Sequence, residues 1–233
     1  MRDYNFGRHA DRFIKVCGMK EADNVRKVAR LMPMLMGFIF YDKSPRYAGN
    51  LDPEVVKELP EPISAVGVFV DSPPEEIRKI CKKYGIDIIQ LHGSETPSVC
   101  AELKSEGFIV FKAFGIHEGF DWESVRPYEG VADMYVFDTR CGCRGGSGEK
   151  YDWSILDRYP FSTPYLLSGG IGPDDCEKVL SELRPKMAGV DINSRFESQP
   201  GIKDTDKLIH FIFSLRRHNE EESFANPFRQ KKQ

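Results

Sequence analysis

The sequence predicts an α/β fold, the (β/α)8 TIM barrel, in which eight parallel strands are surrounded by helices. Apolar, β-rich runs recur at roughly 20- to 30-residue intervals, and stretches of helical composition lie between them. Strict alternation of this kind is typical of parallel strands joined by crossover helices. Several runs are apolar almost throughout, as expected of strands covered on both faces. The length of 233 residues is close to that of a barrel.

The strands and helices are expected in a regular order along the chain. The predicted strands cover residues 13–17, 36–41, 65–70, 86–91, 108–114, 133–138, 164–168 and 187–192. The predicted helices include residues 21–31, 73–84, 96–105, 174–183 and 205–215. A doubly wound open sheet is the alternative, but the G-x-G-x-x-G signature is missing after the first strand.

No linker divides the chain, so we expect one barrel over residues 13–217. A polar N-terminal extension covers residues 1–12, and residues 218–233 are charged, contain a proline and lack an apolar period. We expect these residues to form a polar C-terminal tail, and neither end to carry chemistry.

The composition is that of an ordinary globular protein. Hydrophobic residues make up 40% and charged residues 30%, and the formal charge of -3 gives no overall attraction to nucleic acid or anionic membranes. The sequence shows neither a long apolar span nor the apolar core of a signal peptide, so a cytoplasmic location is expected. The 6 cysteines lack the dense spacing of a disulfide scaffold, and we expect free thiols.

Two side chains suited to proton transfer stand at the ends of predicted strands, where a barrel places its active site. Cys17 follows the first strand, and a thiolate there is a competent base. Asp138 ends the sixth strand, and a carboxyl group can donate a proton if apolar surroundings raise its pKa. The alternatives are a buried packing cysteine and an ordinary turn aspartate.

Glycine-rich and polar segments after later strands indicate an anion site. Gly169 and Gly170 follow the seventh strand, and a barrel commonly binds phosphate with the loops after its seventh and eighth strands. The eighth strand leads into a segment with three polar candidates: Asp191, Asn193 and Ser194.

The loop of residues 140–148 contains four glycines and suits a lid that closes over substrate, or a plain flexible loop. Cys141 and Cys143 lie in it, but no second Cys or His pair stands at ligand spacing, so a zinc site is not expected.

Three further residues are candidates for lining the site. Arg46 lies beyond the second strand beside a proline and suits a carboxylate, although a surface arginine is the commoner case. Gln90 and His92 end the fourth strand. A histidine without a second ligand is more often a hydrogen-bonded structural residue than a metal ligand.

At these residues the chain resembles phosphoribosylanthranilate isomerase, an enzyme of tryptophan biosynthesis, over nearly all of residues 13–215. Seven motifs match those of the family, and their shared order along the chain is far more specific than any single motif. The matching motifs are KVCGM (15–19), GFIFYDKSPRY (37–47), QLHG (90–93), FDT (137–139), GGSG (145–148), SGG (168–170) and PGIKD (200–204).

The resemblance implies an isomerase that converts N-(5-phosphoribosyl)anthranilate into 1-(2-carboxyphenylamino)-1-deoxyribulose 5-phosphate by an Amadori rearrangement. It implies a small phosphorylated substrate, no metal and no organic cofactor, in a monomer or a homodimer. By the same resemblance, Cys17 is the general base, Asp138 the general acid and Arg46 the ligand of the anthranilate carboxylate. The phosphate would be bound by Gly169, Gly170 and residues 191–194.

The chain departs from the family pattern after the eighth strand, where Asn193 replaces a small hydroxyl residue and Arg195 a small residue. This puts the side-chain part of phosphate recognition in question. Two alternatives remain: the histidine-pathway isomerase, which uses two aspartates, and a catalytically silent barrel that only binds a phosphorylated ligand. Cys17 argues against the first, and Cys17 together with Asp138 against the second.

Overall fold

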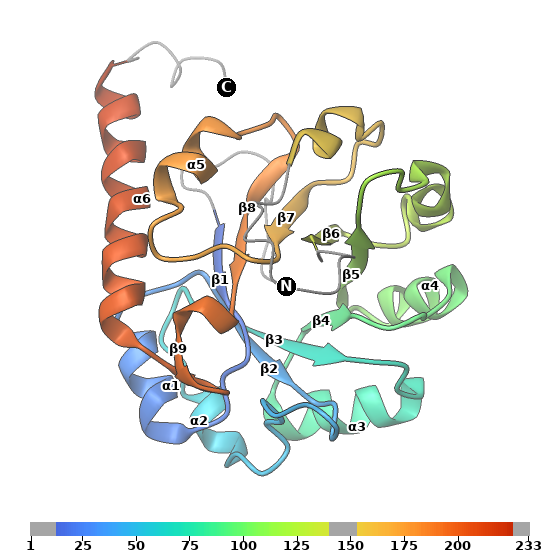
Figure 1. Ribbon diagram of the computed structural model, residues 1–233. Coiled ribbons are helices and arrows are strands. Elements are labelled where there is room, and N and C mark those ends of the chain that lie inside the picture. The colour runs from blue at the N-terminus through green and yellow to red at the C-terminus, as the bar shows by residue number, and fades with distance from the viewer. Residues whose placement is uncertain (1–12, 140–152, 226–233) are drawn as a thin grey trace.

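The computed structural model describes residues 13–139 and 153–225. Its centre is a closed barrel of eight parallel strands in the order β1 to β8, with β8 paired back to β1 (Figure 1). This confirms the predicted (β/α)8 barrel and excludes the open sheet. The strands are β1 (Phe13–Val16), β2 (Leu35–Ile39), β3 (Ser64–Phe69), β4 (Ile88–Leu91), β5 (Ile109–Ile116), β6 (Met134–Thr139), β7 (Tyr165–Ser168) and β8 (Met187–Ile192).

Helices surround the strands on the outside of the barrel (Figure 1). Acidic residues in first turns and prolines at the first helical positions favour several of the helix starts. The α-helices are α1 (Ala22–Ala29), α2 (Pro53–Lys57), α3 (Pro74–Tyr84), α4 (Pro97–Ser105), α5 (Cys176–Ser181) and α6 (Thr205–Ala225). The 3-10 helices are η1 (Trp122–Tyr128), η2 (Trp153–Arg158) and η3 (Ser194–Phe196).

The structure corrects several predicted boundaries. Helix α5 begins at Cys176 rather than at residue 174, because Asp175 turns back to accept a hydrogen bond from the Gly172 amide at 2.8 Å. The backbone of α6 continues to Ala225, so the first part of the expected polar tail is helical. A small antiparallel hairpin, β9 (Glu197–Gln199) and β10 (Ile202–Lys203), follows the barrel and was not predicted.

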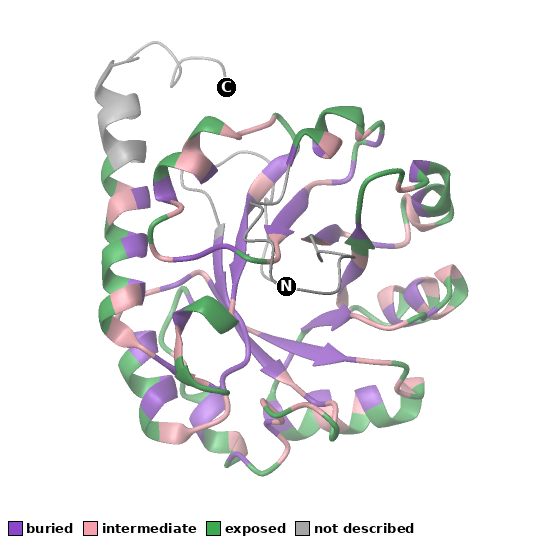
Figure 2. Ribbon diagram, in the orientation of Figure 1, coloured by how far each residue is buried: buried purple, intermediate pink, exposed green. Residues whose placement is uncertain are grey.

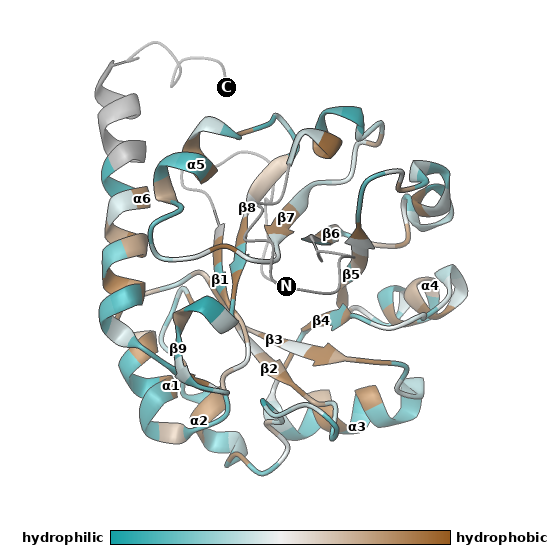
Figure 3. Ribbon diagram, in the orientation of Figure 1, coloured by the Kyte–Doolittle hydropathy of each residue, from teal (hydrophilic) through white to brown (hydrophobic). Residues whose placement is uncertain are grey.

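Alternation along the strands divides the apolar residues into two cores. One cluster fills the barrel interior with side chains from successive strands that stand level in the strand register. The larger cluster lies between the outer surface of the sheet and the helices. Figure 2 shows the strands as the most buried part of the chain, and Figure 3 shows hydrophilic residues on the exposed parts of the helices.

The interior is not apolar throughout. Lys15 and Asp191 are register partners where β1 meets β8, and both face the interior with Nζ 3.0 Å from each carboxylate oxygen. An ion pair therefore joins the first and last strands of the barrel. Within the described ranges, no helix combines the length and apolarity needed to cross a membrane.

Candidate active site

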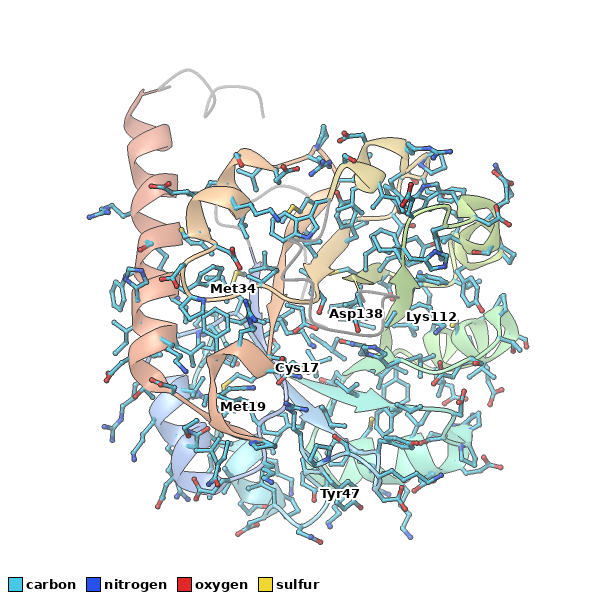
Figure 4. The ribbon with its side chains drawn as sticks, viewed as in Figure 1. Cys17, Met19, Met34, Tyr47, Lys112 and Asp138 are labelled. Carbon is cyan, nitrogen blue, oxygen red and sulfur yellow. The ribbon has the colours of Figure 1, made fainter. Side chains whose placement is uncertain are left out.

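A cavity of about 310 Å³ opens at the carboxyl ends of the strands. Figure 4 places Cys17 and Asp138 near the centre of the barrel, and both side chains line this cavity. The other predicted residues that line it are Gln90, His92, Gly169, Gly170, Asp191, Asn193 and Ser194. Of the predicted site residues, only Arg46 is not part of the cavity wall.

Cys17 lies immediately after β1, where its amide donates to the Ile192 carbonyl at 2.9 Å. Its side chain needs the space left by Gly37, since a Cβ built there would lie 2.8 Å from Sγ. Burial raises the pKa of the Cys17 thiol. The positive charges of Lys15 and Lys203 oppose that rise, the Asp191 carboxylate adds to it, and Lys15 also donates a hydrogen bond to the sulfur. The thiol is thus buried beside two ammonium groups that favour its thiolate form.

The Lys15–Asp191 pair supplies one of those charges. Both residues are buried, and Lys15 is completely inaccessible. Burial acts to lower the pKa of Lys15, but contact with Asp191 and Cys17 raises it overall. Burial also raises the pKa of Asp191, and the Lys15 ammonium opposes that rise. Because both carboxylate oxygens lie 3.0 Å from Nζ, we treat the pair as ionised.

Asp138 faces His92 across the cavity, with Oδ2 3.7 Å from His92 Nε2. The other ring nitrogen, Nδ1, is 2.9 Å from Gln90 Nε2. When the Gln90 amide donates to Nδ1, the neutral imidazole carries its hydrogen on Nε2, directed toward Asp138. Gln90 Oε1 is buried and has no hydrogen-bond partner in the part of the chain that the structure describes.

The backbone around His92 is fixed by a second buried lysine. Lys112 on β5 donates to the carbonyls of Leu91 and Gly93, on either side of His92, at 3.1 and 2.8 Å. It also lies 3.2 Å from Glu95, whose carboxylate accepts from the amides of Gly93 and Asp71. This network holds the end of β4 rigidly beside the reacting groups.

The segments after β7 and β8 form the far wall of the cavity. Gly169 and Gly170 have φ of 93° and 68°, a region that favours glycine. The short helix η3 begins at Ser194, which lines the same cavity, and the first N–H groups of a helical turn have no acceptor within the turn. Arg195 is exposed, with its Nε 3.6 Å from a Cβ built on Gly172. The wall combines glycine backbone, free-ended amides and one cation, which suits an anion.

Arg46 lies next to the cavity and is bound by a carboxylate of its own chain. Glu197 accepts from Arg46 Nε at 2.8 and 3.1 Å and from Nη2 at 2.7 Å. The hydrogen bonds that Arg46 donates to Glu197 raise the pKa of Arg46. The Arg46 side chain and Asn193 both pack against Gly18, the residue after Cys17. Arg46 is therefore a neighbour of the cavity rather than part of its wall.

Sequence reasoning missed three charged residues that organise the site: Lys15, Glu197 and Lys203. A lysine inside the apolar run of β1 is a signal that could have found Lys15, because a charged residue in a buried strand needs a partner. Glu197 and Lys203 stand on the unpredicted hairpin, and Lys203 gives a signal only as part of the PGIKD motif (200–204). The predicted lid of residues 140–148, with Cys141 and Cys143, lies outside the described residues, as do residues 1–12.

A family model described as N-(5'phosphoribosyl)anthranilate (PRA) isomerase matches residues 14–213. The chain belongs to the PRA isomerase family. Among curated PRA isomerases, that of Parabacteroides distasonis is 46% identical over 201 residues, covering 85% of this chain and 91% of the relative. That of Phocaeicola vulgatus is 42% identical over 203 residues, covering 87% and 97%.

Solved PRA isomerases share the barrel. The enzyme from Thermus thermophilus superposes with a TM-score of 0.75 at 28% identity, covering 88% of this chain and 99% of that one. A PRA isomerase in complex with reduced 1-(o-carboxyphenylamino)-1-deoxyribulose 5-phosphate gives a TM-score of 0.74 at 29% identity, with coverages of 89% and 100%. These PRA isomerases match the chain over nearly their whole length.

Proposed function

We propose that this chain converts N-(5'-phosphoribosyl)anthranilate into 1-(2-carboxyphenylamino)-1-deoxyribulose 5-phosphate in tryptophan biosynthesis, with Cys17 as general base and Asp138 as general acid. The observation that carries the proposal is that these two groups, one directly after β1 and one in β6, line one cavity in a member of the PRA isomerase family. A base and an acid on opposite sides of a sugar are what an aldose-to-ketose rearrangement requires.

The reaction begins at Asp138. Its carboxylic acid gives a proton to the furanose ring oxygen, the bond from that oxygen to C1 breaks, and the lone pair of the anthranilate nitrogen forms a C1=N bond. The positive charge on this Schiff base makes the proton on C2 acidic. The Cys17 thiolate then takes that proton, and the electrons of the C2–H bond form a C1=C2 enolamine, which becomes the 2-ketone when C1 gains a proton and the hydroxyl on C2 loses one.

The charged groups around Cys17 assist this step. Burial raises the pKa of the thiol and makes the thiolate a stronger base. The Lys15 and Lys203 ammonium groups limit the free-energy cost of forming that thiolate. His92 faces the Asp138 carboxyl group and is oriented by Gln90. Each reacting group thus has a neighbour that fixes its geometry or its charge.

The anionic ends of the substrate have matching partners. Gly169, Gly170 and the start of η3 form the wall proposed for the phosphate. Lys203 Nζ donates to Asn193 Oδ1 at 2.7 Å and to the Asn193 carbonyl at 3.2 Å, so both serve that lysine and the proposed phosphate ligands are backbone N–H groups. Arg46 is the proposed partner of the anthranilate carboxylate.

A turnover assay tests the function directly. Phosphoribosylanthranilate generated enzymatically from anthranilate and added to the purified full-length protein should lose its fluorescence with first-order kinetics. The product should be identified by mass spectrometry after borohydride reduction. Substrate that persists at its uncatalysed rate in the presence of folded protein would contradict the proposal.

The proposal includes a monomeric or homodimeric enzyme located in the cytoplasm. A related PRA isomerase from Thermotoga maritima is described as dimeric, and its chain is 29% identical to this one. Sedimentation of the purified protein measures the oligomeric state, and cell fractionation measures the location.

A further inference from the structure

The side chain of Glu197 is nearly inaccessible, with 5% of its surface exposed, yet it belongs to a hairpin outside the barrel. It occupies the Nε and Nη2 edge of the Arg46 guanidinium with the two-pronged geometry typical of arginine and carboxylate. The Arg46 side chain remains 20% exposed. A guanidinium has two edges that can bind a carboxylate, so this contact leaves the second edge for another anion.

Lys203 fixes Glu197 from the other side. Its Nζ lies 2.7 Å from Glu197 Oε1 and 2.7 Å from Asn193 Oδ1, and its side chain is completely buried. The backbone of Lys203 is held in turn by Asn24 of α1 through two hydrogen bonds of 2.8 Å. The Glu197 carboxylate is therefore anchored to the body of the barrel.

The resulting cluster of Arg46, Glu197 and Lys203 carries two positive charges and one negative charge. The net positive charge favours an anion, and the cluster lies against Gly18, directly beside the proposed base. Through Asn193 the same cluster reaches the proposed phosphate wall. One set of contacts thus connects the places proposed for the two anionic ends of the substrate.

We infer that Glu197 is a positioning residue that orients Arg46 toward the carboxylate of the aromatic substrate, and that Lys203 couples this orientation to the phosphate end. The inference rests on the proposed function. An arginine held by a buried partner loses little conformational entropy when it binds, so Glu197 gives selectivity for a carboxylated aromatic amine over its carboxyl-free counterpart.

Two inert compounds test this by calorimetry without turnover: reduced 1-(o-carboxyphenylamino)-1-deoxyribulose 5-phosphate and the same molecule lacking its carboxyl group. Glu197→Gln should weaken binding of the carboxylated compound roughly 10- to 100-fold, because a misplaced guanidinium no longer matches the carboxylate. It should change binding of the carboxyl-free compound less than about threefold. Lys203→Met should weaken both, because Lys203 also holds Asn193.

A double-mutant cycle shows whether Glu197 acts through Arg46. In an Arg46→Ala background, Glu197→Gln should cause no further loss for the carboxylated compound. Glu182→Gln is the matched control, because Glu182 pairs with Arg184 at 2.9 Å in the loop that precedes β8, at the other end of the barrel. If Glu197→Gln does not fold, Glu197→Asp keeps the charge beside Lys203 and provides the same comparison.

If Glu197→Gln loses equal affinity for the two compounds, or binds the carboxylated one more tightly, the positioning role of Glu197 is overturned. Turnover by the wild-type protein would still support the proposed function in that case. A wild-type protein that neither turns over substrate nor binds either compound would overturn both.

Discussion

Cys17 shows how a single side chain depends on its surroundings. It packs where Gly37 leaves room for sulfur, and burial raises its pKa while two lysines oppose that rise. Asp138 faces His92 across the cavity, and the Asp191 carboxylate lines the same cavity and interacts with Asp138. The two proposed reacting groups therefore have distinct environments, as expected of a base and an acid that act in one reaction.

Replacing either reacting group should abolish most of the chemistry. Cys17→Ser and Asp138→Asn should each lower kcat by roughly two to four orders of magnitude, the usual contribution of a positioned base or acid. Circular dichroism and thermal melting should show an intact fold. Cys81→Ser is the control, since Cys81 is a buried residue of α3 and does not line the cavity. Near-wild-type turnover in either variant would remove that residue from its proposed role.

Glu197 should make the free energy of unfolding depend on pH in the acidic range. Burial acts to raise its pKa, but hydrogen bonds from Arg46 and Lys203 outweigh this and lower it to about 2 from 4.5. A lowered pKa in the folded state gives stability that is present above the unfolded pKa and is lost as pH falls through the folded pKa.

Urea unfolding of wild type and Glu197→Gln should therefore differ by a constant amount above pH 4.5, and the difference should shrink as the pH approaches about 2. The comparison extends down to the lowest pH at which both proteins are folded. A difference that grows on acidification would show that Glu197 is not ionised in this network.

The buried Lys112 holds the loop after β4, and its contribution to stability should exceed that of Lys104, a lysine on the surface. Lys112→Met should lower the free energy of unfolding by about 3–5 kcal/mol, because it leaves Glu95 buried without its cation. Lys104→Met, which breaks a partly exposed pair with Asp133, should cost only about 0–1 kcal/mol. Chemical denaturation measures both, and equal losses would mean that burial does not decide the effect.

Gly170, in the loop after β7, and Gly130, between η1 and β6, form a matched pair of glycines. Gly170 has φ of 68° and open space around a built Cβ, and it lines the cavity. Gly130 has φ of 81° and equally open space but is not part of the cavity wall. Both Val variants share the backbone strain of a positive φ.

Only Gly170→Val should raise the KM for substrate, by about tenfold or more, which corresponds to roughly 1.4 kcal/mol. Inhibition by inorganic phosphate should weaken in parallel. The same KM in both variants would place the phosphate elsewhere.

The elements differ in how far sequence predicts them. The barrel strands are predictable because residues buried on both faces leave long apolar runs, and each of the strands β1 to β8 overlaps its predicted range. Helix η1 has no clear helical period and contains Pro127, so its short 3-10 turn gives no pattern to detect. The hairpin of β9 and β10 contains only a few residues, and its role comes from contacts with Arg46 and Asn24 that are distant in sequence.

For the molecule as a whole, strand order explains why the candidate site was predictable. Residues at the carboxyl ends of parallel strands meet at one end of a barrel, so Cys17, Asp138 and Gly170 could be grouped before any contact was known. The ion pair of Lys15 with Asp191 could not be predicted in this way, because it depends on the register in which β1 meets β8.

Barrel closure gives a prediction for the whole molecule. Lys15→Met should lower the free energy of unfolding by about 3–5 kcal/mol, since it leaves Asp191 buried and unpaired. The double variant Lys15→Met with Asp191→Leu should recover most of this loss, to within about 1–2 kcal/mol. Turnover should stay low in both, because Cys17 has lost a neighbouring cation. Recovery of turnover together with stability would show that Lys15 is needed only for closure.

The joining of β1 to β8 also determines when a newly made chain becomes an enzyme. Ribosomes synthesise Lys15 and Cys17 early, but the carboxylate that neutralises Lys15 belongs to the last strand of the barrel. Until that strand emerges, a growing chain has an open sheet edge and a lysine without its interior partner. Activity therefore arises only after β8 has been synthesised, and products of premature termination before β8 are inactive.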